Sequence, residues 1–357
     1  MKILVVSNLY PSADDPYYGT FVRNFTESLT EAFPGDVRTC LIRGRRKQKF
    51  HRFCTYAGFY LRLLGQTLFG RYDLIYVHTV TFPTPVLRVV SAFRRLPLVF
   101  NVHGDDVIPS NRFKCRLRDM CRPLLPKARM IVTPSRYFRG VVLEEFAGLD
   151  PERVIVSASG GVAEKFFHKP SKDFDHVPVL GFVSRIDPEK GWDTYIDALV
   201  QLRREGVRFR GVMAGAGAQR PQMVAELKST GLDDCVDFLG PLSQDELAAL
   251  YPTLDIMVFP SRRRAESLGL VGLEAMASGV PVVACDNNGA ASYVEDGVNG
   301  YLIKPADATG LVSKIKEFLA LDNAGRRAMS LAALDTALEY SSPAVHAGLM
   351  AQIRRLL

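Results

Sequence analysis

The sequence predicts an α/β protein built from two doubly wound domains, each with a mostly parallel sheet. The chain has 357 residues, which exceeds the size at which a single hydrophobic core usually stops growing. Short apolar runs alternate with segments of helical period, a pattern typical of a parallel sheet with helices on both faces. The same alternation starts again after residue 178.

The first half of the chain alternates strand-like and helix-like segments. Its apolar runs are short enough for strands, and the segments between them repeat their apolar residues with helical spacing. The predicted strands are Ile3–Val6, Leu74–Val77, Leu98–Val102 and Met130–Thr133, and the predicted helices are Phe21–Phe33, Pro85–Phe93 and Tyr137–Phe146.

The second half repeats this organisation after a polar segment. Residues 165–177 lack apolar periodicity and contain a proline, so we interpret them as a linker. We expect one domain at 1–168, a second at 169–341, and a C-terminal helix, about 342–357, that joins the first domain. The predicted strands are Pro178–Val183, Phe209–Ala214, Val236–Leu239, Asp255–Phe259 and Pro281–Cys285, with a helix at Trp192–Arg204.

This architecture predicts where a ligand binds. Ligands of open parallel sheets bind beyond the carboxyl ends of the strands. We therefore expect the two domains to face each other across a deep cleft that holds the active site.

Composition indicates an ordinary globular enzyme, with 47% apolar and 23% charged residues. The apolar runs are strand-sized, and nothing resembles a secretory signal, so we expect a cytoplasmic protein without a membrane span. The six cysteines form no CxxC pair, which favours reduced thiols over disulfides or zinc. The net charge of +7 favours an anionic partner, such as a nucleotide or a phospholipid headgroup.

The most informative stretch is 260–300. Here a strand is followed by a loop with Glu266, then by a predicted helix that contains Glu274 and begins at Ser267-Leu268-Gly269-Leu270. A helix start with small residues exposes backbone N–H groups and suits a phosphate. A carboxylate at Glu274 can accept two hydrogen bonds from a ribose, and Glu266 lies within reach of a sugar hydroxyl. The alternative is that both glutamates are solvated surface residues.

Two further loops carry candidate residues. In Gly181–Gly191 a strand is followed by Arg185 and Lys190, cations suited to clamp a diphosphate and to offset its charge as it leaves. Their alternative is a solvated basic loop. In the first half, Gly19 lies in the loop 16–22, where glycine permits close approach of the backbone to a ligand, although a simple helix-initiating turn has the same sequence.

The pattern of Arg185, Lys190, Glu266 and Glu274 resembles the large retaining glycosyltransferase family of the GT-B fold, whose signature is two glutamates separated by seven residues. The likeness extends to Ser159-Gly160-Gly161-Val162, similar to the interdomain turn of that family, and to residues 236–240, similar to its base-binding segment. Two positions depart from the family pattern. Leu268 replaces a frequent Phe, and residues 158–161 replace Pro-Asn-Gly.

The resemblance implies a role for each candidate residue. The second domain, 169–341, would bind the nucleotide sugar, with Arg185 and Lys190 on the diphosphate and Glu274 on the ribose. Glu266 would contact the transferred sugar, Leu239 would lie at the base, and the amides of Leu268–Leu270 would contact sugar and phosphate. His103 resembles the histidine of the family's His-Gly motif, which faces the reacting sugar, although a lone histidine is more often structural. The same two interpretations, a structural residue or one that faces the sugar, apply to His78, which also lies at a strand end.

The implied reaction moves a hexose-type sugar from a UDP- or GDP-sugar to an acceptor bound by domain 1–168, with retention of configuration. This family includes bacterial transferases of cell-envelope synthesis, so the implied acceptor is a saccharide or a lipid-linked saccharide. No cofactor and no metal are implied. Asp173-Phe174-Asp175 has the spelling of a metal-binding motif, but its linker position favours a surface role.

The segment Arg43–Phe69 is basic and rich in aromatic residues and leucine, which suits binding to an anionic membrane surface. The alternative is an ordinary amphipathic helix packed on the sheet.

A nucleotide-sugar epimerase of similar architecture is the rival enzyme. Nucleic-acid binding is disfavoured because the basic residues are spread over both halves, and nothing in the sequence calls for more than a monomer.

Overall fold

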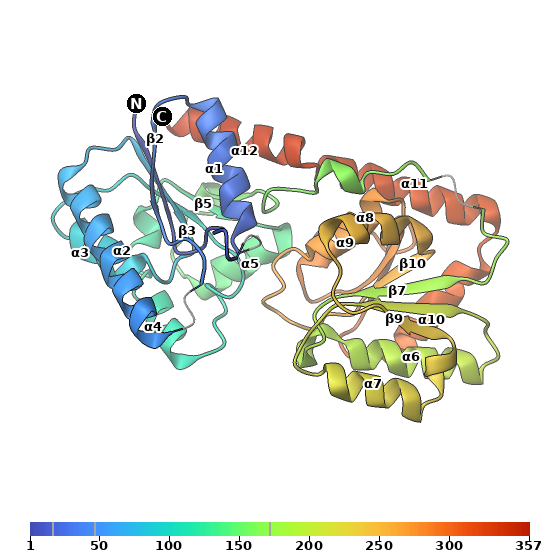
Figure 1. Cartoon of the computed structure of the whole chain (residues 1–357). Helices are drawn as coiled ribbons and strands as arrows, with labels where there is room; N and C mark the ends of the chain where they lie inside the picture. Colours follow the sequence, from blue (N-terminus) through green and yellow to red (C-terminus); the bar gives the residue numbers. More distant parts are fainter. Residues whose placement is uncertain (16–17, 46–47, 171–172) are drawn as a thin grey trace. The chain divides into compact units, whose positions relative to one another are not determined.

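The computed structural model describes residues 1–15, 18–45, 48–170 and 173–357, which form two compact units (Figure 1). Unit 1 consists of Met1–Gly160 and Val345–Leu357, and unit 2 consists of Gly161–Ala344. Each unit holds one six-stranded sheet in which all neighbouring strands are parallel. The prediction of two doubly wound α/β domains is confirmed.

In unit 1 the sheet order is β2-β1-β3-β4-β5-β6. The chain therefore reverses its direction of travel between β1 and β3, which is where such sheets usually bind ligands. The strands are β1 (Ile3–Ser7), β2 (Val37–Leu41), β3 (Leu74–His78), β4 (Leu98–Asn101), β5 (Met130–Thr133) and β6 (Val154–Val156), and the helices are α1 (Thr20–Ala32), α2 (Lys49–Phe69), α3 (Thr84–Ser91), α4 (Arg112–Asp119), α5 (Arg136–Glu145) and α12 (Ser342–Leu356).

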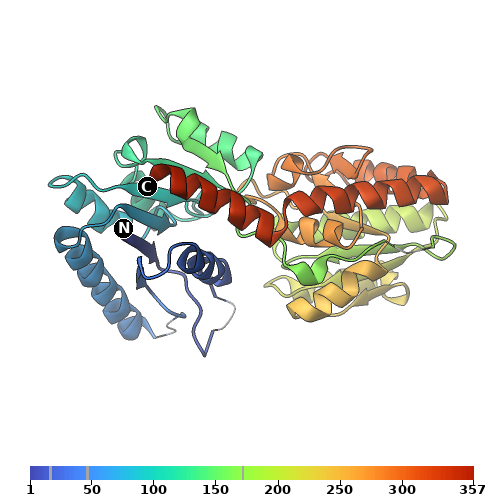
Figure 2. The same ribbon diagram turned by 90° about the horizontal axis from the view of Figure 1, so that it is seen from above.

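Helices cover both faces of this sheet because successive strand residues point to opposite sides. On one face Val6 and Phe100 pack with Phe59 of α2 and with side chains of α3 and α5. On the other face Val5 packs with α1 and with Ile353 of α12. The C-terminal helix thus completes unit 1, and both chain termini lie at one edge of that unit (Figures 1 and 2).

Unit 2 has the sheet order β12-β11-β10-β7-β8-β9, so its reversal falls between β7 and β10. Its strands are β7 (Val179–Val183), β8 (Arg210–Ala214), β9 (Val236–Phe238), β10 (Ile256–Phe259), β11 (Val282–Cys285) and β12 (Gly300–Ile303), and its helices are α6 (Trp192–Arg204), α7 (Arg220–Ser229), α8 (Gln244–Leu250), α9 (Leu270–Ala277), α10 (Ala308–Ala320) and α11 (Asn323–Glu339).

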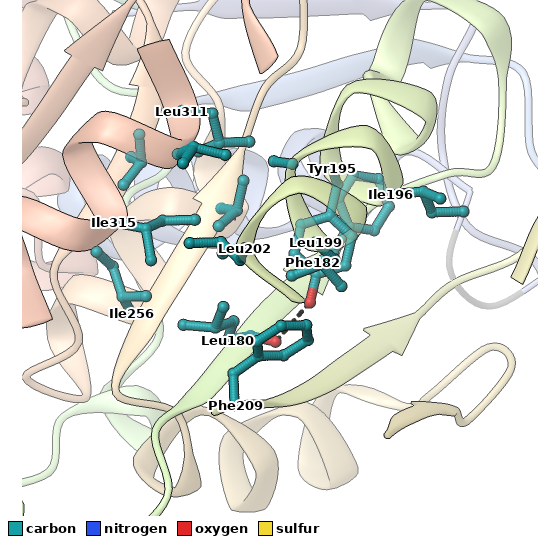
Figure 3. Close-up of a cluster of buried hydrophobic side chains, with 14 of the residues drawn as sticks. Leu180, Phe182, Tyr195, Ile196, Leu199, Leu202, Phe209, Ile256, Leu311 and Ile315 are labelled. Carbon is teal, nitrogen blue, oxygen red and sulfur yellow. Dashed lines mark hydrogen bonds between the residues drawn. The ribbon is translucent and has the colours of Figure 1, made fainter. Parts of the chain in front are cut away.

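The core of unit 2 holds β7 firmly in the middle of the sheet. Leu180 and Phe182 of β7 pack against Ile196 and Leu199 of α6 (Figure 3). The buried hydroxyl of Tyr195 donates a hydrogen bond of 2.6 Å to the Leu180 carbonyl oxygen. The loop that leaves β7 therefore starts from a rigid strand and ends at a rigid helix.

The division between the units falls after Gly160, whereas the sequence suggested 168/169. The segment interpreted as a linker lies on unit 2, because Phe166 and Phe174 within it are buried. Phe174 belongs to the same core as Leu180. These two buried side chains attach the segment to unit 2, although its apolar residues follow neither a helical nor a strand period. Ser171 and Lys172 of the same segment lie outside the described residues.

Candidate functional site

Two loops meet at the carboxyl ends of β7 and β10, the neighbouring strands at which the sheet of unit 2 reverses. Residues 184–191 follow β7 and carry Arg185 and Lys190, and residues 260–269 follow β10 and carry Glu266. Adjacent parallel strands bring their carboxyl ends to one edge. The structure therefore brings together predicted site residues that are far apart in the sequence.

The centre of this site is an ion pair between Lys190 and Glu266. Both side chains are largely buried, with 11% and 18% of their surfaces exposed. The buried hydroxyl of Ser261 donates a second hydrogen bond, of 3.3 Å, to the same carboxylate oxygen of Glu266. Neither Lys190 nor Glu266 is therefore the solvated surface residue that the sequence left open as an alternative.

Arg185 differs from Lys190 in its surroundings. Its guanidinium lies 2.7 Å from Asp187 within the same loop, and 60% of the side chain is exposed. An exposed pair of this kind contributes little to stability and is easily exchanged for another anion. Arg185 is therefore available to a ligand at little cost, whereas Lys190 must give up a buried partner.

The two loops are tied together by residues that the sequence analysis did not select. Arg262 donates hydrogen bonds of 2.6 Å to Asp193 and 2.7 Å to the Pro188 carbonyl. Gly191 has a φ of +77°, and its α-carbon packs so tightly on the Pro260 carbonyl that no side chain fits. These contacts fix Lys190 relative to the second loop.

Asn288 is a further residue missed from sequence. It is fully buried, and its side-chain amide donates a 2.5 Å hydrogen bond to the Ser261 carbonyl. The next residue, Gly289, donates its backbone N–H to the Glu266 carbonyl at 2.8 Å. The Asp-Asn-Asn-Gly sequence directly after the predicted strand Pro281–Cys285 was the signal that would have revealed this support.

Helix α9 begins at the same edge of the sheet. Gly269 caps the helix with a φ of +79°, and its carbonyl accepts a 2.8 Å hydrogen bond from the Tyr293 hydroxyl. Ser267 and Leu270 are partly exposed beside it. The side chain of Leu268 is buried, so only the backbone of this residue can serve a ligand.

Glu274 lies one turn into α9 and is almost completely buried. The Tyr251 hydroxyl donates a hydrogen bond of 3.2 Å to its carboxyl group. Burial raises the pKa of Glu274 to about 7, although the bond from Tyr251 acts in the opposite direction. A carboxyl in this state changes its charge near neutral pH, and a ligand that donates hydrogen bonds to it would favour the ionised form.

Leu239 lies just beyond β9, two strands away from β7 in the sheet order. Its side chain is about half exposed, while its backbone N–H donates a 2.9 Å hydrogen bond to the Met213 carbonyl. An exposed leucine held by its backbone offers an apolar surface to a ring, so its position suits the base-contact role expected from sequence.

In unit 1, Gly19 caps α1 with a φ of +72°. A side-chain carbon at this position would lie 2.6 Å from the Leu9 carbonyl carbon, so only glycine fits. Gly19 follows β1 and therefore lies in a loop at the reversal point of this sheet. Pro16 and Tyr17 of the same predicted loop lie outside the described residues.

His103 follows β4 and pairs with His78, which ends β3. Their Nε2 and Nδ1 atoms are 3.3 Å apart, and the His103 ring lies 4.5 Å from the Phe21 ring centroid. The carboxyl of Asp106 accepts a 2.8 Å hydrogen bond from the His103 backbone N–H. Burial lowers the pKa of His103 to about 4. Burial, and to a lesser extent the neighbouring His103, lowers the pKa of His78 well below its usual value. Both rings are therefore neutral at pH 7.

Two parallel-sheet Rossmann-like domains in one chain define the GT-B class of architecture. Residues 163–333 match the family model described as Glycosyl transferases group 1. Residues 20–160 match the model described as Glycosyltransferase Family 4. Both halves of the chain therefore match glycosyltransferase family models, which supports a glycosyltransferase of the GT-B fold.

Individual relatives agree with this assignment. The D-inositol 3-phosphate glycosyltransferase of Nocardia farcinica is 28% identical over 81% of this chain and 68% of its own length. The alpha-D-kanosaminyltransferase of Streptomyces kanamyceticus is 33% identical over 47% of this chain and 43% of its own length. Among the first four curated relatives, the matched share of the relative's own length lies between 32% and 68%.

Solved structures resemble the whole chain at lower identity. The sucrose-phosphate synthase of Thermosynechococcus elongatus has a TM-score of 0.77 at 19% identity and covers 100% of this chain and 99% of its own. Anabaena HepE in complex with UDP-glucose has a TM-score of 0.74 at 21% identity and covers 100% of both chains. These similarities confirm the GT-B fold.

Proposed function

We propose that the protein transfers a hexose-type sugar from a nucleotide-diphosphate sugar to an acceptor hydroxyl. The observation that supports this most directly is the meeting of Lys190 and Glu266 between β7 and β10. A cation and a carboxylate at the reversal point of a parallel sheet suit a ligand that carries both phosphates and sugar hydroxyls. The structures of HepE with UDP and with UDP-glucose add support for a UDP-sugar, beside the GDP-sugar that the sequence left open.

Each predicted residue has a role in this proposal. Unit 2 binds the donor and unit 1 the acceptor. Arg185 and Lys190 hold the diphosphate together with the backbone at residues 267–270, Glu274 accepts hydrogen bonds from the ribose, and Glu266 accepts them from the sugar. Leu239 contacts the base, and Gly19 and His103 contact the donor sugar from unit 1.

The reaction breaks the bond between the anomeric carbon and the phosphate oxygen, and a new bond forms from the acceptor oxygen to that carbon. Negative charge grows on the departing phosphate, where Arg185, Lys190 and the start of α9 stabilise it. We propose retention of configuration through attack on the same face, with the acceptor's proton passing to the departing phosphate. The proposed enzyme needs no metal and acts as a monomer.

The test of the donor is a thermal-shift panel of UDP-, GDP- and ADP-sugars with the whole chain. A ligand that binds only the folded state raises the melting temperature, by an amount set by its concentration relative to Kd. One donor is expected to raise the melting temperature by several degrees, and Glu274→Ala and Arg185→Ala are expected to reduce that shift. The proposal fails if no nucleotide sugar shifts the wild type, or if both variants respond like the wild type.

We propose a saccharide or a lipid-linked saccharide as the acceptor, in the synthesis of a bacterial surface polysaccharide or glycolipid on the cytoplasmic side of the membrane. Two curated relatives are named for different compounds, D-inositol 3-phosphate and 2-deoxystreptamine. The relatives are transferases, and the epimerase alternative receives no support from them.

We further propose that α2 binds an anionic membrane surface, as predicted for Arg43–Phe69. Phe59 and Leu63 of α2 pack on the sheet, as in the alternative, while Phe50, Phe53 and Phe69 are 74%, 72% and 86% exposed. These exposed rings support the proposal of a membrane contact. Residues 37–72 contain no Asp or Glu, which favours attraction to anionic lipid. Arg46 and Lys47 lie outside the described residues, and among the described residues no helix is long and apolar enough to span a bilayer.

Sedimentation with lipid vesicles tests this surface. Wild-type protein is expected to sediment with vesicles that contain phosphatidylglycerol and to remain in solution with neutral vesicles. Phe50→Ser combined with Phe53→Ser is expected to weaken binding about tenfold or more, since the proposed contact loses two phenyl rings that would enter the lipid. Leu338→Ser, at an exposed apolar position on α11 of unit 2, is the control and should bind like the wild type. Equal sedimentation with anionic and neutral vesicles would contradict the proposal.

A further inference from the structure

Lys190 and Glu266 neutralise each other in the structure, although the proposed function assigns both to the donor. Their charged groups form a direct ion pair in a largely buried setting. A buried ion pair has a substantial interaction energy, and removal of one partner leaves the other charge uncompensated. A diphosphate can therefore bind Lys190 only if another group compensates the negative charge of Glu266.

The carboxylate is the fixed member of this pair. Glu266 is held at its carbonyl by the Gly289 N–H at 2.8 Å and at its carboxylate by the Ser261 hydroxyl at 3.3 Å. Lys190 carries its ammonium group on a flexible four-carbon stem. A phosphate that enters the site can draw the ammonium away while the carboxylate stays in place.

We propose that Glu266 acts as an internal counter-ion that competes with the nucleoside diphosphate for Lys190 and so promotes release of this product. The inference rests on the proposed function. With the intact donor, sugar hydroxyls donate hydrogen bonds to Glu266 and compensate for its lost cation. Once the sugar has left with the acceptor, Glu266 has no such donors and faces a more negatively charged diphosphate. The ion pair between Glu266 and Lys190 then forms again, and the diphosphate loses its contact with the Lys190 ammonium group.

This role predicts an unusual gain of affinity. Glu266→Gln keeps the shape of the side chain but removes its charge, so Lys190 is available to phosphate without competition. Calorimetry with the full chain is expected to show about tenfold tighter binding of the nucleoside diphosphate that matches the donor, and tighter binding of inorganic pyrophosphate. The intact nucleotide sugar should gain less, because the substitution also weakens its contact to the sugar. Transfer should become limited by release of the product.

The matched control is Glu189→Gln, which removes the same charge from the adjacent loop. Glu189 is mostly exposed, and its carboxylate lies 3.6 Å from Arg263. Its substitution is expected to change diphosphate affinity less than twofold. A double-mutant cycle adds Lys190→Met, and in that background Glu266→Gln should lose most of its effect, because the competition needs both partners. Chemical denaturation followed by the fluorescence of Trp192 checks that each variant is folded.

The outcomes separate this inference from the proposed function. If the wild type binds a nucleoside diphosphate and folded Glu266→Gln binds it no more tightly, the counter-ion role is wrong and the donor site stands. The same conclusion follows if Glu189→Gln gains as much affinity. If neither wild type nor Glu266→Gln binds any nucleoside diphosphate or pyrophosphate, both the proposed function and this inference are wrong.

Discussion

Replacing Lys190 by methionine is expected to lower the rate of sugar transfer by about 100-fold or more. In the proposed reaction its ammonium offsets the charge that develops on the departing diphosphate, and removal of one such group typically costs a factor of about 100 to 1,000 in kcat. The measurement is release of nucleoside diphosphate from the donor that the thermal-shift panel identifies. Methionine preserves most of the aliphatic stem, so packing against the neighbouring loop is largely kept.

A loss of folding must be separated from a loss of catalysis in this experiment. Lys190→Met leaves the largely buried Glu266 without its cation, which destabilises a protein. The combined Lys190→Met and Glu266→Gln variant removes both charges, and we expect it to fold stably but to remain slow. Lys228→Met, at an exposed position on α7, should retain wild-type activity. Activity of folded Lys190→Met within threefold of the wild type would contradict the assigned role.

Glu274→Gln is expected to make unit 2 more stable than wild type at pH 8, and this advantage should disappear near pH 5. Burial raises the pKa of the native carboxyl to about 7, above its usual value of 4.5, so the folded state binds a proton that the unfolded state releases. The stability that this proton provides is fully present below about 4.5 and is lost as the pH rises through about 7. By linkage the loss amounts to roughly 3 kcal/mol at most.

Urea denaturation at pH 5 and pH 8 measures this difference. Trp192 is the only tryptophan of the chain and lies in α6 of the same unit, so its fluorescence follows the relevant domain. Glutamine keeps an oxygen for the Tyr251 hydroxyl but does not titrate. Glu226→Gln, at an exposed position on α7, should leave the pH dependence of the wild type unchanged. If the stability of wild type and of Glu274→Gln changes equally between pH 5 and pH 8, folding does not raise the pKa of this carboxyl and the prediction is wrong.

Strong periodicity made several elements predictable from sequence. The helix expected at Trp192–Arg204 has those bounds in the structure, because its apolar residues recur on one face and Gly191 marks its start. The buried runs at β1, β3, β5 and β10 were equally clear, since both faces of these strands are covered and nearly every residue is apolar.

Weakly patterned elements were missed. Strand β2 lies at the edge of its sheet and has a mixed sequence, with only Cys40 fully buried among its five residues. Strand β12 lies at the edge of the other sheet and begins with a glycine, and its four residues are too few to show a strand period, although three of them are buried. Local pattern is uninformative at such edges, because pairing with a neighbour forms the strand.

The sequence by itself determined the fold class, the two-domain organisation and the residue types of the candidate site, because hydrophobic period and loop chemistry are local properties. Only the tertiary structure decided how these residues are paired. Lys190 and Glu266 are separated by a large part of a domain, yet they meet because β7 and β10 are neighbours in the sheet. Tyr251 meets Glu274 for a similar reason, because the short turn that follows α8 packs against α9. Burial and the hydrogen-bond or ion-pair partners set the charge state of each group, and neither can be predicted from the local sequence.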